Sequence, residues 1–401
     1  MNHHLEQEFE KHFGKSSGPF IHSQAPGRVN LIGEHTDYND GFVFPIAIDR
    51  FTALLAKARP DQKVRLFSAA QNEPAEFSVA GVVAKDAPKW SLYAKGVAEA
   101  LRQRGLVKSG IDALVTTTVP IGGGLSSSAS FEVATGLALL AANGKTLDKV
   151  ELALAAQWAE HNYAGMPCGI MDQFISALGE KDHAMLLDCR DLSRRQVPMK
   201  DAQMRILIAN TNVKHELVQG EYQARRNQCE RAVATLKKRF PAVKALRDAD
   251  LSMLEACRME MDPTVFRRGR HVISENARTL QFADAMAGAD WAACGQLMYQ
   301  SHESLRDDYG VSCPELDALV EIAATVPGVY GARMTGGGFG GSIVAMVRQQ
   351  ALEALTAEID KQYPKRCGKQ ASMFATTAGA GAEFRNGAEI TSPKPDLPSL
   401  T

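Results

Sequence analysis

A glycine- and serine-rich loop constrains this chain more than any other feature. It runs from Pro120 to Ser130 (PIGGGLSSSAS), follows a run of β-branched residues at 113–119, and opens a helix almost free of charge. Three glycines let successive backbone N–H groups point inward, and the helix that begins near Ser127 adds unpaired N–H groups and a positive dipole end. The loop is therefore suited to phosphate. The alternative is a capped helix start after a flexible loop, and no GxxxxGK[ST] motif occurs in the chain.

A second glycine loop, TGGGFGGS, lies late in the chain, from Thr335 to Ser342. Gly336, Gly338 and Gly341 formally satisfy the GxGxxG pattern of dinucleotide-binding folds. The next residues, SIVAMV, are typical of a strand, whereas a Rossmann site requires a helix there. Close approach of the backbone to another group explains these glycines better. Two such loops suit a phosphate chain that is held from two sides.

Polar side chains form an unusual run between two apolar strands: Glu34, His35, Thr36, Asp37 and Tyr38. Fixed carboxylates and an imidazole can accept from, and donate to, the vicinal hydroxyl groups of a neutral polyhydroxyl ligand. One alternative is a metal site, although no second histidine stands at ligand spacing. The other alternative is a polar surface turn. We interpret the run as a candidate sugar site.

One acid stands in an otherwise apolar stretch. Asp172 follows a proline-glycine turn and has Ile170, Met171 and Phe174 as neighbours. A carboxylate in this position is either a helix cap or a buried acid with a chemical task. The residues alone slightly favour the cap.

Charge and cysteine usage restrict the partners and the compartment. The 401 residues are enough for two or three domains, and the formal net charge of −1 argues against nucleic acid or an acidic membrane surface as the partner. The seven cysteines are scattered without a CxxC pair, which is typical of reduced thiols in a cytoplasmic protein. With no apolar signal core and no apolar run of about 18 residues, we expect no membrane span.

Hydrophobic periodicity predicts helices over 5–13, 90–104, 127–143, 148–163, 170–178, 216–238 and 273–307, and strands over 42–48, 113–119 and 204–210. The segment Gly328–Val347 is typical of a strand, a glycine loop, and a further strand or helix. Because 204–210 reads as a new buried strand, we predict domains over 1–200 and 201–401. The tail after about residue 383 is proline-rich, and we expect it to be flexible.

Together these segments resemble the galactokinases, members of the GHMP kinase superfamily. GRVNLIGEHTDYNDG is similar to the galactokinase signature, GGGLSSSAS to the phosphate loop of the superfamily, and RMTGGGFGGS to its third motif. AGMPCGIMDQF, NTNVKHEL and GEYQARRNQC are also similar to galactokinase segments. The resemblance extends from about residue 20 to about residue 382. The first motif is specific to the family, whereas the glycine loops identify only the superfamily.

The resemblance implies an α/β (α+β) fold of two lobes with the active site between them. The first lobe would resemble a ribosomal-protein-S5-like unit, and the second would be a C-terminal α/β domain. The implied reaction transfers the γ-phosphoryl group of ATP to the C1 hydroxyl of α-D-galactose, with Mg²⁺ as cofactor, in the first committed step of galactose catabolism (the Leloir pathway). The expected partners are galactose and ATP, with neither nucleic acid nor membrane, and we expect a cytoplasmic monomer.

The same resemblance assigns site residues position by position. Asp172 matches the active-site aspartate and Arg28 its partner arginine, which would keep Asp172 ionised to accept the C1-hydroxyl proton. The sugar-contacting positions are Glu34, His35, Asp37, Gly169, Asp172 and Tyr222. The phosphate loop is Gly122, Gly123, Gly124, Leu125, Ser126, Ser127 and Ser128. Trp90 matches a tryptophan near the adenine, with a core tryptophan as the alternative. Ser126 and Glu160 match positions near Mg²⁺.

Other functions stay open at this stage. An N-acetylgalactosamine kinase or another GHMP sugar kinase would use the same loops, because the sequence does not reveal the pocket wall opposite the sugar run. A non-catalytic galactose sensor, as among some fungal paralogues, lacks two residues within the phosphate loop. Here Ser128 and Ala129 are both present, so an enzyme is favoured. Neither repeats, coiled coils nor charge blocks support a structural protein.

Overall fold

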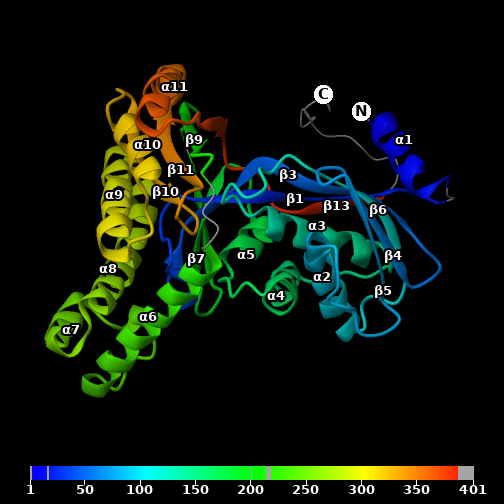
Figure 1. The fold of residues 1–401 in the computed structure, drawn as a ribbon, viewed down its shortest axis with the longest axis horizontal. Coiled ribbons are helices and arrows are strands. Elements are labelled where there is room, and N and C mark those ends of the chain that lie inside the picture. Colours follow the sequence, from blue (N-terminus) through cyan, green and yellow to red (C-terminus); the bar gives the residue numbers. More distant parts are fainter. Residues whose placement is uncertain (1, 16–17, 200, 214–217, 387–401) are drawn as a thin grey trace.

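The computed structural model describes residues 2–15, 18–199, 201–213 and 218–386, and Figure 1 shows helices packed on two main sheets. The larger sheet has the strand order β13-β1-β3-β6-β4-β5. All of its neighbouring strands are antiparallel except β4 and β6. Its strands are β1 (Ile21–Asn30), β3 (Pro45–Ala58), β4 (Lys63–Ser68), β5 (Glu73–Ser78), β6 (Ile111–Thr117) and β13 (Glu383–Asn386).

Alternating side chains give this sheet two apolar faces. Leu54 and Ala56 of β3 belong to the core that four helices complete, whereas Leu55 between them packs with Phe9 of α1 (Asn2–Phe13) on the other face. The four helices lie together along one side of the sheet in Figure 1. They are α2 (Leu92–Gln103), α3 (Ser127–Ala142), α4 (Lys149–Ala159) and α5 (Met171–Leu178).

The second main sheet has the order β10-β11-β9-β12, and each neighbouring pair is antiparallel. Its strands are β9 (Met204–Asn210), β10 (Val329–Thr335), β11 (Ser342–Arg348) and β12 (Ser372–Thr376). Helices α6 (Val218–Arg239), α7 (Leu251–Ala256), α8 (Pro263–Ala287), α9 (Trp291–Ser304), α10 (Pro314–Ala324) and α11 (Leu352–Cys367) accompany it. A small third sheet pairs β2 (Phe42–Val43), β7 (His183–Asp188) and β8 (Arg194–Pro198).

One apolar cluster joins the two lobes. Ile206 and Ile208 of β9 share it with Val29 of β1 and Ile46 of β3, whereas Leu207, on the opposite face of β9, belongs to the core of the second lobe. A shared core fixes one lobe against the other, because separating them would expose these side chains to water. Groups on β1 and on the second glycine loop can therefore meet in a defined geometry.

Most predicted elements are confirmed, and the differences have local causes. The prediction of one continuous helix over 273–307 is wrong, because α8 ends at Ala287 and a second helix, α9, begins at Trp291. Between them, the Asp290 carboxylate accepts from the N–H of Ala293 at 3.0 Å and so begins a new helix. The open choice for the end of 328–347 resolves to the strand β11. The predicted strand over 42–48 is divided into β2 and β3.

The predicted boundary near residue 200 lies just before β9, but β13 returns to pair with β1 of the first sheet. The domain ranges 1–200 and 201–401 stay a prediction. Of the tail predicted to be flexible, residues 383–386 form β13, and 387–401 lie outside the described residues. Within the described ranges, none of the helices combines the length and the apolar character needed to cross a membrane.

Candidate active site

An ion pair between β1 and α5 lies at the centre of the candidate site. Arg28 donates from Nε to Oδ1 of Asp172 at 2.7 Å and from Nη2 to Oδ2 at 2.9 Å. Its Nη1 donates to the carbonyl of Gly124 in the first glycine loop at 2.6 Å. Ile170 occupies the N-cap position of α5 and Asp172 lies within the first turn of the helix, so the cap interpretation of Asp172 is wrong. The arginine fixes the carboxylate in orientation and ties it to the glycine loop.

The first glycine loop leads into the N-terminus of α3, beside the carboxylate of Asp172. Gly122, Gly124 and Ser126 all have positive φ, and α3 begins at the next residue, Ser127. The Ser126 hydroxyl does not cap α3 and instead donates to Oδ2 of Asp172 at 2.5 Å. The interpretation as a merely capped helix start is therefore wrong, and the first N–H groups of α3 have no side-chain cap.

The two glycine loops contact each other across the lobes. Ser342 donates from Oγ to the carbonyl of Gly123 at 2.8 Å. A Cβ at Gly336 would lie 3.2 Å from the carbonyl oxygen of Gly124, which is tighter than ordinary contact. This is the close backbone approach expected from the second loop, and no helix of the Rossmann kind follows it.

Glu34 connects the predicted sugar run to the second glycine loop. Its Oε1 accepts from the N–H of Gly336 at 2.8 Å, from Oγ1 of Thr335 at 3.0 Å, and from Nη1 of Arg333 at 3.4 Å. Within the described part of the chain, all of the hydrogen bonds to the Glu34 carboxylate end on Oε1. The buried acid therefore holds the second lobe to the sugar run while its Oε2 makes no hydrogen bond to a described residue.

Aromatic residues from both lobes surround His35. Its Nδ1 lies 2.8 Å from the hydroxyl of Tyr38, which lies 2.7 Å from the hydroxyl of Tyr309. The ring of Tyr222, on α6, is centred 5.9 Å from the imidazole. Burial, with the positive charges of His271 and Arg225, lowers the pKa of His35 to about 3, so its imidazole is neutral. Sequence reasoning missed Tyr309, because nothing near it in the chain marks it as a site residue.

Asp37 packs directly against the chain segment that leads to Asp172. A Cβ at Gly169 would lie 1.8 Å from Oδ2 of Asp37, so only glycine fits at that position. Oδ1 of Asp37 accepts from the N–H of Tyr38 at 3.0 Å. Burial, followed by the negative charge of Asp172, raises the pKa of Asp37 to about 7. Two predicted sugar contacts are thus adjacent to each other and to the predicted catalytic acid.

Buried acids gather behind the start of α3. Glu160 opens a π-helical turn, η3 (Glu160–Ala164), and its Oε2 accepts from Nε2 of Gln173 at 2.6 Å. The same Nε2 donates to Oε2 of Glu132 at 3.1 Å. Burial and the charge of Asp172 raise the pKa of Glu160 to about 7, while contact with the Ser128 hydroxyl lowers it. Sequence reasoning missed Gln173 and Glu132, since each looks like an ordinary polar residue in a helix.

This arrangement suits a hard divalent cation. Oxygen ligands are available from the carboxyl groups of Glu160 and Asp172 and from the Ser128 and Ser126 hydroxyls that contact them. The described residues contain no cluster of three or more His, Cys, Asp or Glu side chains placed to hold a metal. Magnesium commonly binds through one or two protein carboxylates together with substrate phosphates and water, so a closed protein cage is unnecessary.

Two cavities flank the first glycine loop. One, of about 410 Å³, is lined by Trp90, Tyr93 and Phe131 together with Ser127 and Ser128 at the start of α3. The Trp90 ring is centred 5.9 Å from that of Phe131, and its indole N–H is buried without a hydrogen-bond partner in the described structure. An aromatic wall with a free donor beside a phosphate loop suits a nucleotide base.

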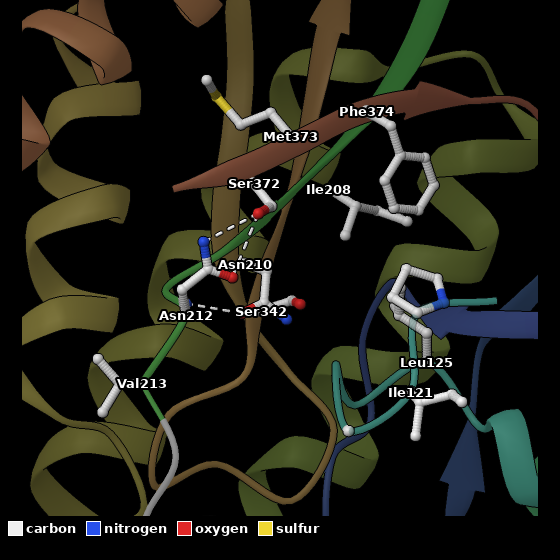
Figure 2. A pocket seen from close by; sticks show the side chains of 12 residues that line it. Ile121, Leu125, Ile208, Asn210, Asn212, Val213, Ser342, Ser372, Met373 and Phe374 are labelled. Atoms are coloured by element: carbon white, nitrogen blue, oxygen red, sulfur yellow. Dashed lines mark hydrogen bonds between the residues drawn. The ribbon is translucent and has the colours of Figure 1, made fainter. Parts of the chain in front are cut away.

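The other cavity, of about 290 Å³, lies between the glycine loop and the second sheet (Figure 2). Ile121 and Leu125 form one wall, and Ile208 and Phe374 lie across from them. Neutral polar groups, such as the Asn210 amide, complete the lining. Neither cavity has a charged side chain in its lining, so the N-terminus of α3 and the aromatic wall of Trp90 are what favour the first cavity for a nucleotide.

Comparisons with known proteins agree on one family. Residues 7–58 match the galactokinase galactose-binding signature, 92–180 the GHMP kinases N terminal domain, and 282–365 the GHMP kinases C terminal. The galactokinase of Chloroflexus aurantiacus is 48% identical over 373 residues, which are 93% of this chain and 95% of that protein. The galactokinase of Chloroflexus aggregans is 47% identical over the same shares.

Solved structures agree as well. The crystal structure of Lactococcus lactis galactokinase complexed with galactose superimposes with a TM-score of 0.91 at 35% identity, covering 95% of this chain and 99% of that one. Mevalonate kinase of Methanococcus jannaschii has a TM-score of 0.66 at 17% identity, covering 91% of this chain and 100% of that one, and so shares the fold.

Proposed function

The chain belongs to the galactokinase family of GHMP kinases, and from that membership we propose that it transfers the γ-phosphoryl group of ATP to the C1 hydroxyl of α-D-galactose, giving galactose 1-phosphate and ADP. The observation that carries the proposal is the two-pronged pairing of Arg28 with Asp172. The pair contacts the phosphate loop through Gly124 and adjoins the predicted sugar run through Asp37. A carboxylate held between a phosphate site and a sugar site is placed to accept the proton of the hydroxyl group that is phosphorylated.

Asp172 is the proposed catalytic acid-base group. As the C1 oxygen attacks the γ-phosphorus, a carboxylate oxygen of Asp172 accepts the hydroxyl proton. Arg28 holds that oxygen in place, which matters because phosphoryl transfer depends mainly on in-line positioning and charge stabilisation. The Ser126 hydroxyl, on the same carboxylate, adds a second restraint on its orientation.

The sugar is proposed to bind against the run that begins at Glu34. The side chains that would contact its hydroxyl groups are Glu34, His35, Asp37, Asp172 and Tyr222, with the backbone of Gly169 as a further wall. Neutral imidazole and paired carboxylates provide both donors and acceptors, as a neutral hexose needs. Adjacent aromatic rings, including those of Tyr38 and Tyr309, limit the access of water to these side chains.

The nucleotide is proposed to follow the loop from Gly122 to Ser128 into the aromatic cavity. Its phosphates would accept from loop N–H groups and from the N-terminus of α3, and its base would lie near Trp90. Mg²⁺ would be held by Glu160 and a loop serine, and it would neutralise phosphate charge during transfer. The serine that the resemblance assigns to the metal is Ser126, whose hydroxyl donates to Asp172, and Ser128, whose hydroxyl contacts Glu160, is a second candidate.

A substrate panel tests the function. At fixed concentrations of ATP and Mg²⁺, the addition of galactose should cause ADP to form. NMR of the sugar product should show that the phosphate is on C1. A higher kcat/KM for N-acetylgalactosamine than for galactose would transfer the proposal to that sugar. Binding of galactose and ATP without ADP release would support a sensor instead. We also propose a monomer in the cytoplasm, where the seven unpaired cysteines would stay reduced.

A further inference from the structure

The Glu160 carboxylate, proposed as the Mg²⁺ ligand, is oriented by a short hydrogen bond from Gln173, with Ser128 and Cys168 as further neighbours. Within the described residues, the single hydrogen bond of ordinary geometry to its side chain comes from Nε2 of Gln173, at 2.6 Å on Oε2. Glu160 is 7% exposed, so water contributes little to holding it. Gln173 occupies Oε2, so Oε1 is the oxygen that can face a metal.

Gln173 is itself held from the other side. Both hydrogens of its amide nitrogen are used, because Nε2 also donates to Oε2 of Glu132 at 3.1 Å. Gln173 and Glu132 are both fully buried. Glu132 lies on α3, whose first residues belong to the phosphate loop, and Gln173 follows Asp172 on α5. One amide therefore connects the proposed metal ligand, the phosphate-loop helix and the catalytic segment.

We propose that Gln173 is a positioning residue for the metal: held by Glu132, it fixes Glu160 so that Oε1 faces the phosphates and the Mg²⁺ they bring. The inference rests on the proposed function, since it takes Glu160 as a metal ligand. Residues that orient a metal ligand by hydrogen bonding typically contribute about 10–100-fold to metal affinity or activity. Changing Gln173 should therefore lower the affinity for the metal and leave the affinity for galactose unchanged.

Metal binding measured without turnover tests this. Mn²⁺ is titrated by EPR into the full chain with ADP present, for wild type and for Gln173→Leu, and galactose affinity is measured by calorimetry. We expect the Mn²⁺ Kd to rise about 10–100-fold, with an unchanged galactose Kd. In assays, the Mg²⁺ concentration for half-maximal rate should rise likewise, and excess Mg²⁺ should restore most of kcat. An unchanged Mn²⁺ Kd overturns the inference.

Several variants keep the result decisive. Gln173→Met keeps the length of the side chain without its donor, and it decides the question if Gln173→Leu does not fold. Thr135→Val is the matched control. Thr135 is buried on α3, and its hydroxyl has no hydrogen-bond partner in the described structure, so this variant should bind Mn²⁺ as wild type does.

Glu160→Gln separates the inference from its premise. If it weakens Mn²⁺ binding but the Gln173 variants do not, the metal assignment stands and the positioning role of Gln173 falls. If it leaves Mn²⁺ binding unchanged, Glu160 is not the ligand, and both the metal assignment and the inference fall. Galactose phosphorylation by wild type would remain a separate result in either case.

Discussion

The backbone of Gly169 lies against the carboxylate of Asp37, so closely that a Cβ at residue 169 would stand 1.8 Å from Oδ2. The two residues come from different segments: Asp37 follows β1, and Gly169 precedes α5. Their contact brings the sugar run and the segment of Asp172 together. It also means that the shape of the proposed sugar site depends on the absence of a side chain.

Gly169→Ala should therefore displace Asp37 and weaken galactose binding. Losing one hydrogen bond to a charged group costs about 1.5–3 kcal/mol, which corresponds to a galactose Kd raised about 10–100-fold. Calorimetry with galactose measures it. Gly81→Ala is a suitable control, because a Cβ there meets nothing within 4 Å. Equal galactose affinity in Gly169→Ala and wild type would show that Asp37 does not contact the sugar.

Asp37→Asn should change stability in a pH-dependent way. The pKa of Asp37 is raised from 3.8 to about 7 in the folded protein, so folding favours its protonated form, and this contribution is lost as pH rises through about 7. An amide cannot ionise. The melting temperature of the variant relative to wild type should thus be higher at about pH 8 than at about pH 5.

Thermal melts across this pH range check the sign for Asp37. The exposed Asp360, changed to Asn, serves as the control for the substitution itself. If the melting temperature of Asp37→Asn minus that of wild type falls as pH rises, Asp37 is stabilised as the anion, which contradicts the burial argument.

Asp172→Asn should abolish most turnover while the protein stays folded. The amide keeps the size of the carboxylate but cannot accept the C1 proton, and losing a general base lowers kcat by at least about 10²-fold. Steady-state kinetics with saturating galactose and ATP measure it, and circular dichroism confirms folding. Turnover near that of wild type would reduce Asp172 to an orienting charge.

Trp90→Ala should weaken the binding of ATP without changing the binding of galactose. Removing an aromatic partner of a nucleic-acid base costs about 1–3 kcal/mol, so the KM for ATP should rise roughly 5- to 100-fold. The KM for galactose serves as the internal control and should not change. If both KM values rise together, Trp90 is a core residue whose loss disturbs the whole lobe.

Local sequence was enough to predict the glycine loops, the polar run from Glu34 and most helices and strands. These features depend on residues close together in the chain: glycines permit positive φ at Gly122 and Gly124, and alternating apolar residues such as Leu54 and Leu55 specify the two faces of a strand. The resemblance to a family then supplied roles that spacing alone left open.

Only the tertiary structure decided how these parts act together. Asp172 follows a turn and looks locally like a helix cap, yet its partner Arg28 is 144 positions away in the chain. Gln173 and Glu132, 41 positions apart, meet through one amide nitrogen that also holds Glu160. Such hydrogen bonds exist because β1, α3 and α5 pack on a common core. A sequence pattern reports local conformational preference, whereas long-range packing determines which distant polar groups come within bonding distance.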